Sequence, residues 1–180
     1  MKKNWTTVEV LGHARHDWLN KIQLIKGNLA LNKIDRAKEI INEIVVEAQE
    51  QSKLSNMKIP QFASLLLTYN WESHSFQVEF EVLDDSANRN RLISDDIITN
   101  WTSSFFEILN SCVKTFHENY LSVTIEQQSN GTRFFFDFRG IITEKEQLME
   151  FLSRESSMEV NVHEVSEQEL ALEVFLPFSE

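Results

Sequence analysis

The segment that decides the fold is LGHARHDWLNKIQLIKGNL, residues 11–29. Its apolar residues recur at alternating spacings of three and four, which is the pattern of an amphipathic helix with one apolar seam. The seam consists of Val8, Leu11, Trp18, Ile22, Ile25 and Leu29, with Arg15 standing where a further apolar residue is due. We therefore expect a helix that needs a partner along one side.

A second helical pattern follows after the short segment LNKID, residues 31–35. Its apolar positions are Ile34, Ala37, Ile41, Ile44 and Ala48, widened by Ile40 and Val45. So short a connection predicts an antiparallel helical hairpin. Two helices cannot bury both apolar faces, and no later segment supplies a matching hairpin. We therefore expect a homodimer that forms a four-helix bundle; the alternative is that the C-terminal half packs on the hairpin within one chain.

Length and composition limit the remaining possibilities. A chain of 180 residues with 42% hydrophobic residues forms one ordinary domain or two small ones. The N-terminal residues contain no apolar run, which argues against a signal peptide, and no stretch of about 18 apolar residues suggests a membrane span. The single cysteine, Cys112, cannot form an internal disulfide, which fits a cytoplasmic protein, and its place on an apolar stripe indicates core packing.

Charge is distributed unevenly along the chain. The net charge of -11 argues against general nucleic-acid binding. Residues 1–38 nevertheless hold eight basic residues against three acidic ones, a net +5, which leaves -16 for residues 39–180. This polarity predicts a docking surface for an acidic partner or a phosphorylated group. A solvated basic helix face is the simpler alternative.

The rest of the chain predicts an α+β layer, a mostly antiparallel sheet with helices on one face. Pro60 suits the first turn of a helix, residues 129–131 suggest a hairpin turn, and Thr143 with Glu146 suggests a capping box. The predicted helices cover residues 61–72, 95–117 and 143–153, the predicted strands cover residues 75–83, 120–127, 132–139, 160–165 and 170–176, and residues 84–91 read as a loop.

His16 is the candidate catalytic residue. At 3.6 residues per turn it lies about 120° from Ile22, outside the apolar seam and accessible to a partner. Asn20 and Gln23 follow four and seven residues later on the same stripe, where their amides can reach a group bound at His16. A neutral imidazole is a competent nucleophile, and phosphoryl transfer depends mainly on positioning and charge neutralisation.

Two other interpretations of this histidine stay open. It can be an exposed side chain without a function, or it can share a metal ion with His13 and Asp17, although the spacing fixes no further ligand. Serine-nucleophile, phosphate-loop and paired-carboxylate motifs do not occur in the sequence.

The string HDWLNK, residues 16–21, looks like the phosphoacceptor helix of two-component signalling proteins. The longer string LGHARHDWLNKIQLIKGNLAL, residues 11–31, closely resembles the sporulation initiation phosphotransferase B family of endospore-forming bacteria. The resemblance continues through KLSN at residues 53–56 and through residues 68–83, and is weaker beyond them.

The resemblance implies that His16, not His13, carries the phosphoryl group on a dimeric four-helix bundle. The donor would be a single-domain response regulator, and the acceptor the receiver domain of the sporulation transcription factor, with Mg²⁺ held by the regulator. The docking and positioning residues would be Arg15, Asp17, Asn20 and Gln23. Asp17 receives no specific role, since adjacent helical residues point apart.

The C-terminal half looks like a degenerate histidine-kinase ATPase domain. Aligned on residues 112–114, the two asparagines of such kinases correspond to Glu107 and Ser111. Their Asp-x-Gly motif corresponds to residues 137–140, where Arg139 replaces the first glycine and so blocks close approach of a nucleotide. We therefore expect a helical phosphotransfer domain at residues 1–58 and an ATPase-like domain at residues 59–180 that does not use ATP. The alternatives are an ATP-dependent histidine kinase and a non-catalytic dimer that sequesters response regulators.

Overall fold

The computed structural model describes residues 5–83, 93–154 and 157–178. The chain divides into two compact units, residues 1–49 and 50–180. The first unit is a helical hairpin, and the second is an α/β unit that begins with the last turns of the second helix.

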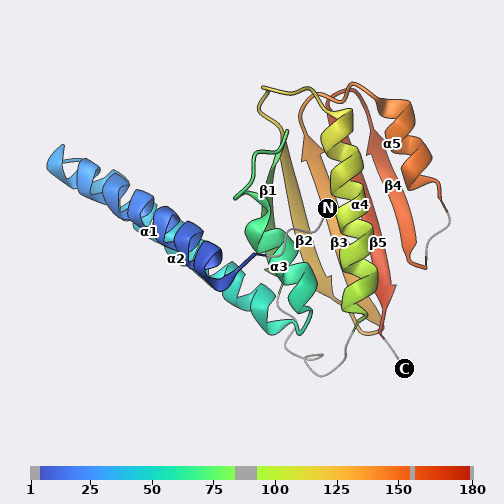
Figure 1. Ribbon diagram of the computed structural model, residues 1–180, viewed down its shortest axis with the longest axis horizontal. Coiled ribbons are helices and arrows are strands. Elements are labelled where there is room, and N and C mark those ends of the chain that lie inside the picture. The colour runs from blue at the N-terminus through green and yellow to red at the C-terminus, as the bar shows by residue number, and fades with distance from the viewer. Residues whose placement is uncertain (1–4, 84–92, 155–156, 179–180) are drawn as a thin grey trace. The chain divides into compact units, whose positions relative to one another are not determined.

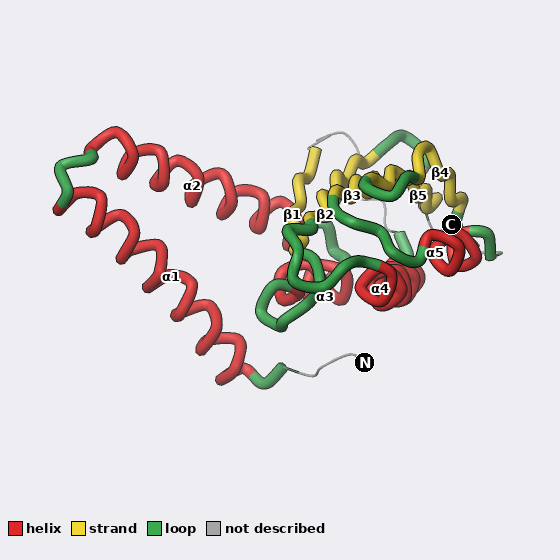
Figure 2. Tube along the Cα trace, turned by 90° about the horizontal axis from the view of Figure 1, so that it is seen from above, coloured by secondary structure: helices red, strands yellow, loops and turns green. Residues whose placement is uncertain are grey.

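The hairpin consists of α1 (Thr7–Ala30) and the greater part of α2 (Ile34–Asn56). A capping box begins α1: the Thr6 hydroxyl accepts the Glu9 N–H, and the Glu9 carboxylate accepts the Thr6 N–H. Asn32 forms the turn with φ 57°, in the left-handed region that asparagine adopts more readily than most residues. The predicted antiparallel hairpin is confirmed, with helices that diverge from the turn (Figure 2).

The hairpin buries little of its apolar surface. Ala37 and Ile40 of α2 are buried, whereas α1 has no buried residue. Lys21 and Glu47 join the helices through an ion pair of 2.5 Å. The exposed seam side chains are Val8, Leu11, Trp18, Ile22, Leu29, Ile34, Ile41 and Val45, each 44–77% exposed. The described hairpin therefore does not cover its own apolar seam.

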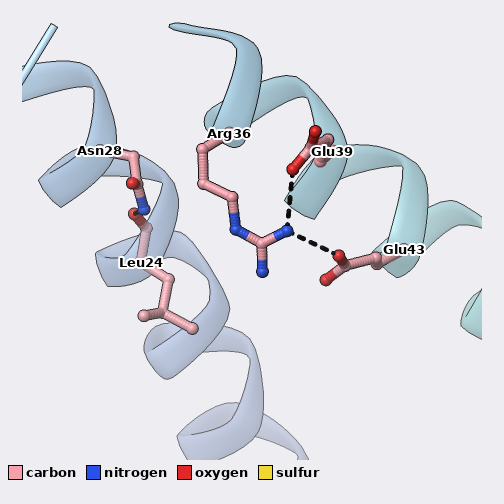
Figure 3. A network of polar contacts seen from close by, with 5 residues as sticks. All are labelled: Leu24, Asn28, Arg36, Glu39 and Glu43. Carbon is pink, nitrogen blue, oxygen red and sulfur yellow. Dashed lines mark hydrogen bonds and ion pairs between the residues drawn. The ribbon is translucent and has the colours of Figure 1, made fainter. Parts of the chain in front are cut away.

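Near the turn, the positive charge of one basic residue is compensated by two acidic side chains (Figure 3). The Arg36 guanidinium donates hydrogen bonds of 3.0 Å to both Glu39 and Glu43, which raise the pKa of Arg36. Asn28 of α1 donates to its own helix, at the carbonyl of Leu24. The charge of Arg36 is therefore compensated within α2.

The α/β unit is a five-stranded sheet with three helices on one face (Figures 1 and 2). Its elements are α3 (Pro60–Tyr69), β1 (Gln77–Leu83), α4 (Asp95–Cys112), β2 (Tyr120–Gln127), β3 (Gly131–Arg139), α5 (Lys145–Leu152), β4 (Glu159–Val165) and β5 (Glu169–Pro177). The strand order is β1-β2-β3-β5-β4, with β1 parallel to β2 and all other pairs antiparallel. The predicted α+β fold class is confirmed.

Phenylalanine side chains of β3 lie at the centre of the hydrophobic core. Successive residues of a strand point to opposite faces, so every second residue of β3 meets the helices. Each of these rings contacts an aromatic ring from another element. The pairs are Phe134–Phe62, Phe136–Phe105 and Phe138–Phe76, with ring centroids 5.1, 5.4 and 6.2 Å apart. Cys112 is fully buried in the same core, as expected, and burial raises the pKa of its thiol.

Side chains close the free edge of β1. Asn70 accepts the Val78 N–H and donates to the Val78 carbonyl, at 2.9 and 2.7 Å. Further along, Glu50 accepts the Val82 N–H and Lys53 donates to the Val82 carbonyl. Burial acts to raise the pKa of Glu50, but the hydrogen bonds from Lys53 and Val82 outweigh it and lower that pKa. An edge paired in this way cannot add another strand.

One helix prediction extended too far. The expected helix to His117 ends at Cys112, because Val113 turns extended (φ -110°, ψ 153°) and pairs with Ile142. Phe116, which lies within the range expected for that helix, is fully exposed with φ 58°.

Two further helix boundaries differ from the prediction. The helix expected to reach Glu72 ends at Tyr69. The capping box of the last helix is wrong: the Thr143 hydroxyl donates to the Cys112 carbonyl, and Glu144 is the N-cap without a side-chain bond. The loop expected at residues 84–91 lies outside the described residues.

Asn119 joins three segments of the α/β unit. Its side chain is 2% exposed. The amide donates to the carbonyls of Ser75 and Lys114 at 2.7 and 2.9 Å, and its oxygen accepts the Ile141 N–H at 3.0 Å. Every polar atom of this buried amide is therefore engaged.

We predict that Asn119→Ala lowers the free energy of unfolding by about 2–4 kcal/mol, because it leaves buried backbone groups without partners. Urea denaturation measures this change. The control Asn161→Ala removes an exposed amide and should change stability by less than about 0.5 kcal/mol. Equal effects of the two variants would contradict the prediction.

Candidate functional site

His16 lies in the middle of α1, where the structure leaves it open to solvent. Its side chain is 72% exposed. By the helical repeat it lies about 140° around α1 from Lys21, the residue that bonds to α2. The imidazole thus projects away from the helix that α1 faces, and its exposure agrees with the accessible position predicted from the sequence.

Two side chains lie close to one ring nitrogen of His16. The Asn20 side-chain nitrogen lies 3.3 Å from Nδ1, and the Asp17 Oδ1 atom lies 3.5 Å from it. Within the described part of the chain, Nε2 makes no hydrogen bond. The two nitrogens therefore differ: one is positioned by the protein, and the other faces solvent.

The contact with Asp17 departs from the expectation that adjacent helical side chains point apart. The carboxylate accepts only if Nδ1 carries a proton, whereas the Asn20 N–H needs a lone pair on the same atom. A hydrogen bond to a charged group is the stronger of the two. The Asp17 contact therefore favours the tautomer with Nδ1–H, which leaves a lone pair on Nε2 for nucleophilic attack.

The other predicted docking residues stand apart from this group. Arg15 and Gln23 are exposed, and neither forms an ion pair or hydrogen bond with the residues that the structure describes. The structure thus brings together His16, Asp17 and Asn20, and leaves Arg15 and Gln23 to solvent.

The metal alternative gains no support from the geometry. The His13 ring packs edge-on against Trp5, with centroids 4.9 Å apart. Among the described residues there is no group of three or more histidine, cysteine or acidic side chains that could hold a metal ion.

The sequence did not show how far the basic charge of residues 1–38 is compensated. Lys21, Arg36 and Lys38 all form ion pairs with acidic side chains. Arg15, Lys26 and Lys33 form none within the described residues. The basic charge that is available to a partner is therefore smaller than the net +5 of residues 1–38 suggests. The signal for this pairing was the spacing of the glutamates Glu39, Glu43, Glu47 and Glu50 along α2, at intervals of four, four and three residues.

The positions that correspond to kinase nucleotide motifs have other roles. Ser111 donates its hydroxyl to its own helix at Ile108, and Glu107 is exposed on α4. At Gly140, an added Cβ would lie 2.2 Å from the Asn119 side-chain oxygen. The backbone at Gly140 is therefore packed against the side-chain amide of Asn119.

Comparisons with known proteins cover both halves of the chain. The α-helical domain of SpoOB-type sensor kinases matches residues 1–57, and the C-terminal domain of sporulation initiation phosphotransferase B matches residues 58–177. The sporulation initiation phosphotransferase B of Bacillus subtilis (strain 168) is 38% identical over 135 residues, which cover 74% of this chain and 69% of that protein.

Two solved structures show distant similarity to this chain. The histidine kinase AdeS of Acinetobacter baumannii is 9% identical, with 92% of this chain and 98% of that chain covered and a TM-score of 0.41. A bacterial phosphotransferase is 12% identical, with 96% and 98% covered and a TM-score of 0.40. At these TM-scores the likeness supports no further argument.

The C-terminal match covers two thirds of the chain and places it among the phosphotransferases. Within that class it belongs to the sporulation initiation phosphotransferase B family, and its activity is phosphotransfer in the sporulation phosphorelay. None of the described helices combines the length and the apolar character that a membrane crossing requires.

We predict that the Asp17 carboxylate enriches the Nδ1–H tautomer of neutral His16. Asp17→Asn removes the charge at nearly constant size and should shift the tautomer balance toward Nε2–H. Nitrogen-15 NMR of the imidazole measures the balance, with Asp35→Asn, on α2, as the control. An unchanged balance in Asp17→Asn would show that the carboxylate does not orient the ring.

Proposed function

We propose that His16 is the phosphoacceptor through which this protein relays a phosphoryl group between response-regulator aspartates. One observation carries the proposal: on the helix that resembles a phosphoacceptor helix, an exposed imidazole has its Nδ1 beside Asp17 and Asn20 and its Nε2 unobstructed. The donor is a single-domain response regulator, and the acceptor is the receiver domain of the sporulation transcription factor.

The transfer needs no other nucleophile. The Nε2 lone pair attacks the phosphorus of the donor's aspartyl phosphate, and the P–O bond breaks with its electrons passing to the aspartate carboxylate. The proton stays on Nδ1, where the Asp17 carboxylate stabilises the positive charge that develops on the ring. In the second step an acceptor aspartate oxygen attacks phosphorus, and the P–N electrons return to Nε2.

Mg²⁺ belongs to this proposal as a group that the regulator holds. When bound, it neutralises charge on the transferring phosphoryl oxygens. Among the described residues, the carboxylate that contacts His16 is that of Asp17, whereas Mg²⁺ prefers several oxygen ligands. The chain's own contribution is to position the imidazole.

The hairpin dimerises into a four-helix bundle in this proposal. The support is the exposed seam: single exposed apolar residues are normal on a monomer, whereas a continuous stripe along two helices marks an interface. Because His16 lies about 120° from Ile22 on α1, a partner on the seam leaves the histidine accessible.

The chain works in the cytoplasm and without ATP in this proposal. A single buried cysteine suits a reducing compartment. The nucleotide-motif positions carry Glu107, Ser111 and Arg139, and Asn119 packs against Gly140. The net charge of -11 disfavours nucleic acid as a partner.

We predict that a regulator carrying labelled phosphate transfers acid-labile label to the wild-type protein and to His13→Ala, but not to His16→Ala. Addition of the acceptor receiver domain should then remove the label from the protein. Label on His16→Ala contradicts the proposed residue. Regulator binding without any transfer would instead support the sequestering module, and labelling of His16 by ATP alone would support a kinase.

We predict that Ile22→Glu converts the dimer to monomer, because it places charges in the apolar seam at the twofold interface. Sedimentation equilibrium measures the mass. Val46→Glu is the matched control, since Val46 is 57% exposed on α2 but lies off the seam. A wild-type chain that is monomeric at micromolar concentration would refute the dimer.

A further inference from the structure

We propose that a hollow at one end of the sheet binds a free α-amino acid with an apolar side chain. The hollow has a volume of about 340 Å³ and is lined by His117, Arg139, Gly140, Ile141, Gln168 and Glu169. This volume lies at the lower end of the range for small-molecule sites. All six residues belong to the α/β unit, so the proposal does not depend on phosphoryl transfer through His16.

The backbone around the hollow is fixed by hydrogen bonds within the chain. The buried Asn119 side chain donates to the Lys114 carbonyl at 2.9 Å and accepts the Ile141 N–H at 3.0 Å. The Gly140 N–H donates to the Gln168 carbonyl at 2.9 Å. The loop after α4, the end of β3 and the turn before β5 are thus held together, and the hollow exists without a ligand.

Backbone strain lies directly beside the hollow. Phe116, the residue before His117, has φ 58°, a conformation that bulky side chains rarely adopt. Its ring is fully exposed, so packing of the ring does not compensate for this strain. Strained residues of this kind cluster at functional sites. The turn of the chain at Phe116 brings His117 to the hollow.

Two opposite charges that line the hollow do not pair with each other. Arg139 and Glu169 are direct partners in the register of β3 and β5, where opposite charges ordinarily attract. Nevertheless, no ion pair joins them in the described part of the chain. The Arg139 guanidinium lies 3.8 Å from the Asp137 carboxylate, which is too far for a hydrogen bond. A positive and a negative group are therefore both available to a ligand.

Two further side chains offer hydrogen-bond donors. His117 accepts the Glu118 N–H at Nδ1, at 2.9 Å, so its neutral ring carries the proton on Nε2 and donates there. The Gln168 side-chain amide makes no hydrogen bond with the residues that the structure describes. Together with the planar fork of Arg139, these groups suit a carboxylate.

An α-amino acid uses both charges of the hollow. Its carboxylate accepts from Arg139 and from the neighbouring donors, and its ammonium group donates to Glu169. Ile141 offers apolar contact for the side chain of the ligand. A simple anion meets repulsion from Glu169, and a simple cation meets repulsion from Arg139, so neither matches the hollow as well.

L-valine and its two half-analogues test the proposal. Isovalerate lacks the ammonium group, and isobutylamine lacks the carboxylate, while both keep the apolar part. In a titration of the full chain followed by proton–nitrogen NMR, L-valine should shift the amide signals of Gly140 and Glu169 and saturate with a Kd of about 1 mM. Each half-analogue should bind about tenfold more weakly, because it loses one charged hydrogen-bonding group.

Variants of the two charged residues test the assigned roles. Arg139→Ala and Glu169→Gln should each weaken L-valine binding about tenfold, since each removes one charged contact. Both side chains are exposed, so the fold should be unchanged. Glu169→Gln should at the same time strengthen isovalerate binding, because it removes the repulsion. Arg154→Ala is the matched control: this arginine is 65% exposed after α5, and its loss should leave L-valine binding unchanged.

Four outcomes would overturn the proposal. The first is the absence of saturable shifts at the hollow with L-valine up to about 20 mM. The second is isovalerate binding as tight as that of L-valine, which would define a site for simple anions. The third is stronger L-valine binding in Glu169→Gln. The fourth is weakening by Arg154→Ala as large as that by Arg139→Ala, which would indicate a non-specific effect of charge. None of these results bears on labelling of His16, so the proposed function is tested separately.

Discussion

Two helices joined by a three-residue turn can shield only one side of each other, and this constraint governs the molecule. In the hairpin, Ala37 and Ile40 of α2 are buried, while most of the other seam residues of both helices stay exposed. Exposed apolar surface of this extent is unfavourable in water at roughly 25 cal/mol per Å². In the proposed dimer a second hairpin would cover that surface and would leave a third side of α1, the one that carries His16, open to a different protein.

The site follows from this division of the helix into sides. One side of α1 faces α2 through Lys21, a second side carries the seam around Ile22, and the third carries His16. A nucleophile that exchanges phosphate with two proteins in turn has to be accessible and oriented at once. Exposure supplies the access, and the Asp17 carboxylate at Nδ1 supplies the orientation without covering Nε2. The α/β unit is closed by its own side chains instead: Asn119 fills the space at Gly140, and Asn70 pairs the free edge of β1.

Much of the fold could be predicted from the sequence, because periodicity is a local property of the chain. The three- and four-residue spacing around Ile22 predicted α1, and the turn signal at residues 129–131 predicted the hairpin of β2 and β3. The exposed position of His16 on the helix was predicted from the same spacing. The residues that act with it, and the domain boundary near residue 58, remain predictions.

Tertiary structure decided the features that depend on residues distant in sequence or on side-chain rotation. The helix was predicted to continue to His117, yet α4 ends at Cys112 because Val113 pairs with Ile142, which follows 29 residues later. Likewise, helix geometry alone separates neighbours, whereas the rotamers of His16 and Asp17 bring Oδ1 to 3.5 Å from Nδ1. The sequence by itself thus determined the elements and their buried faces. Only tertiary structure decided where α4 ends and which side-chain atoms meet. The Val113–Ile142 pairing overrides the local helix preference because it satisfies backbone hydrogen-bonding groups, and the His16–Asp17 contact forms because it pairs a charged group.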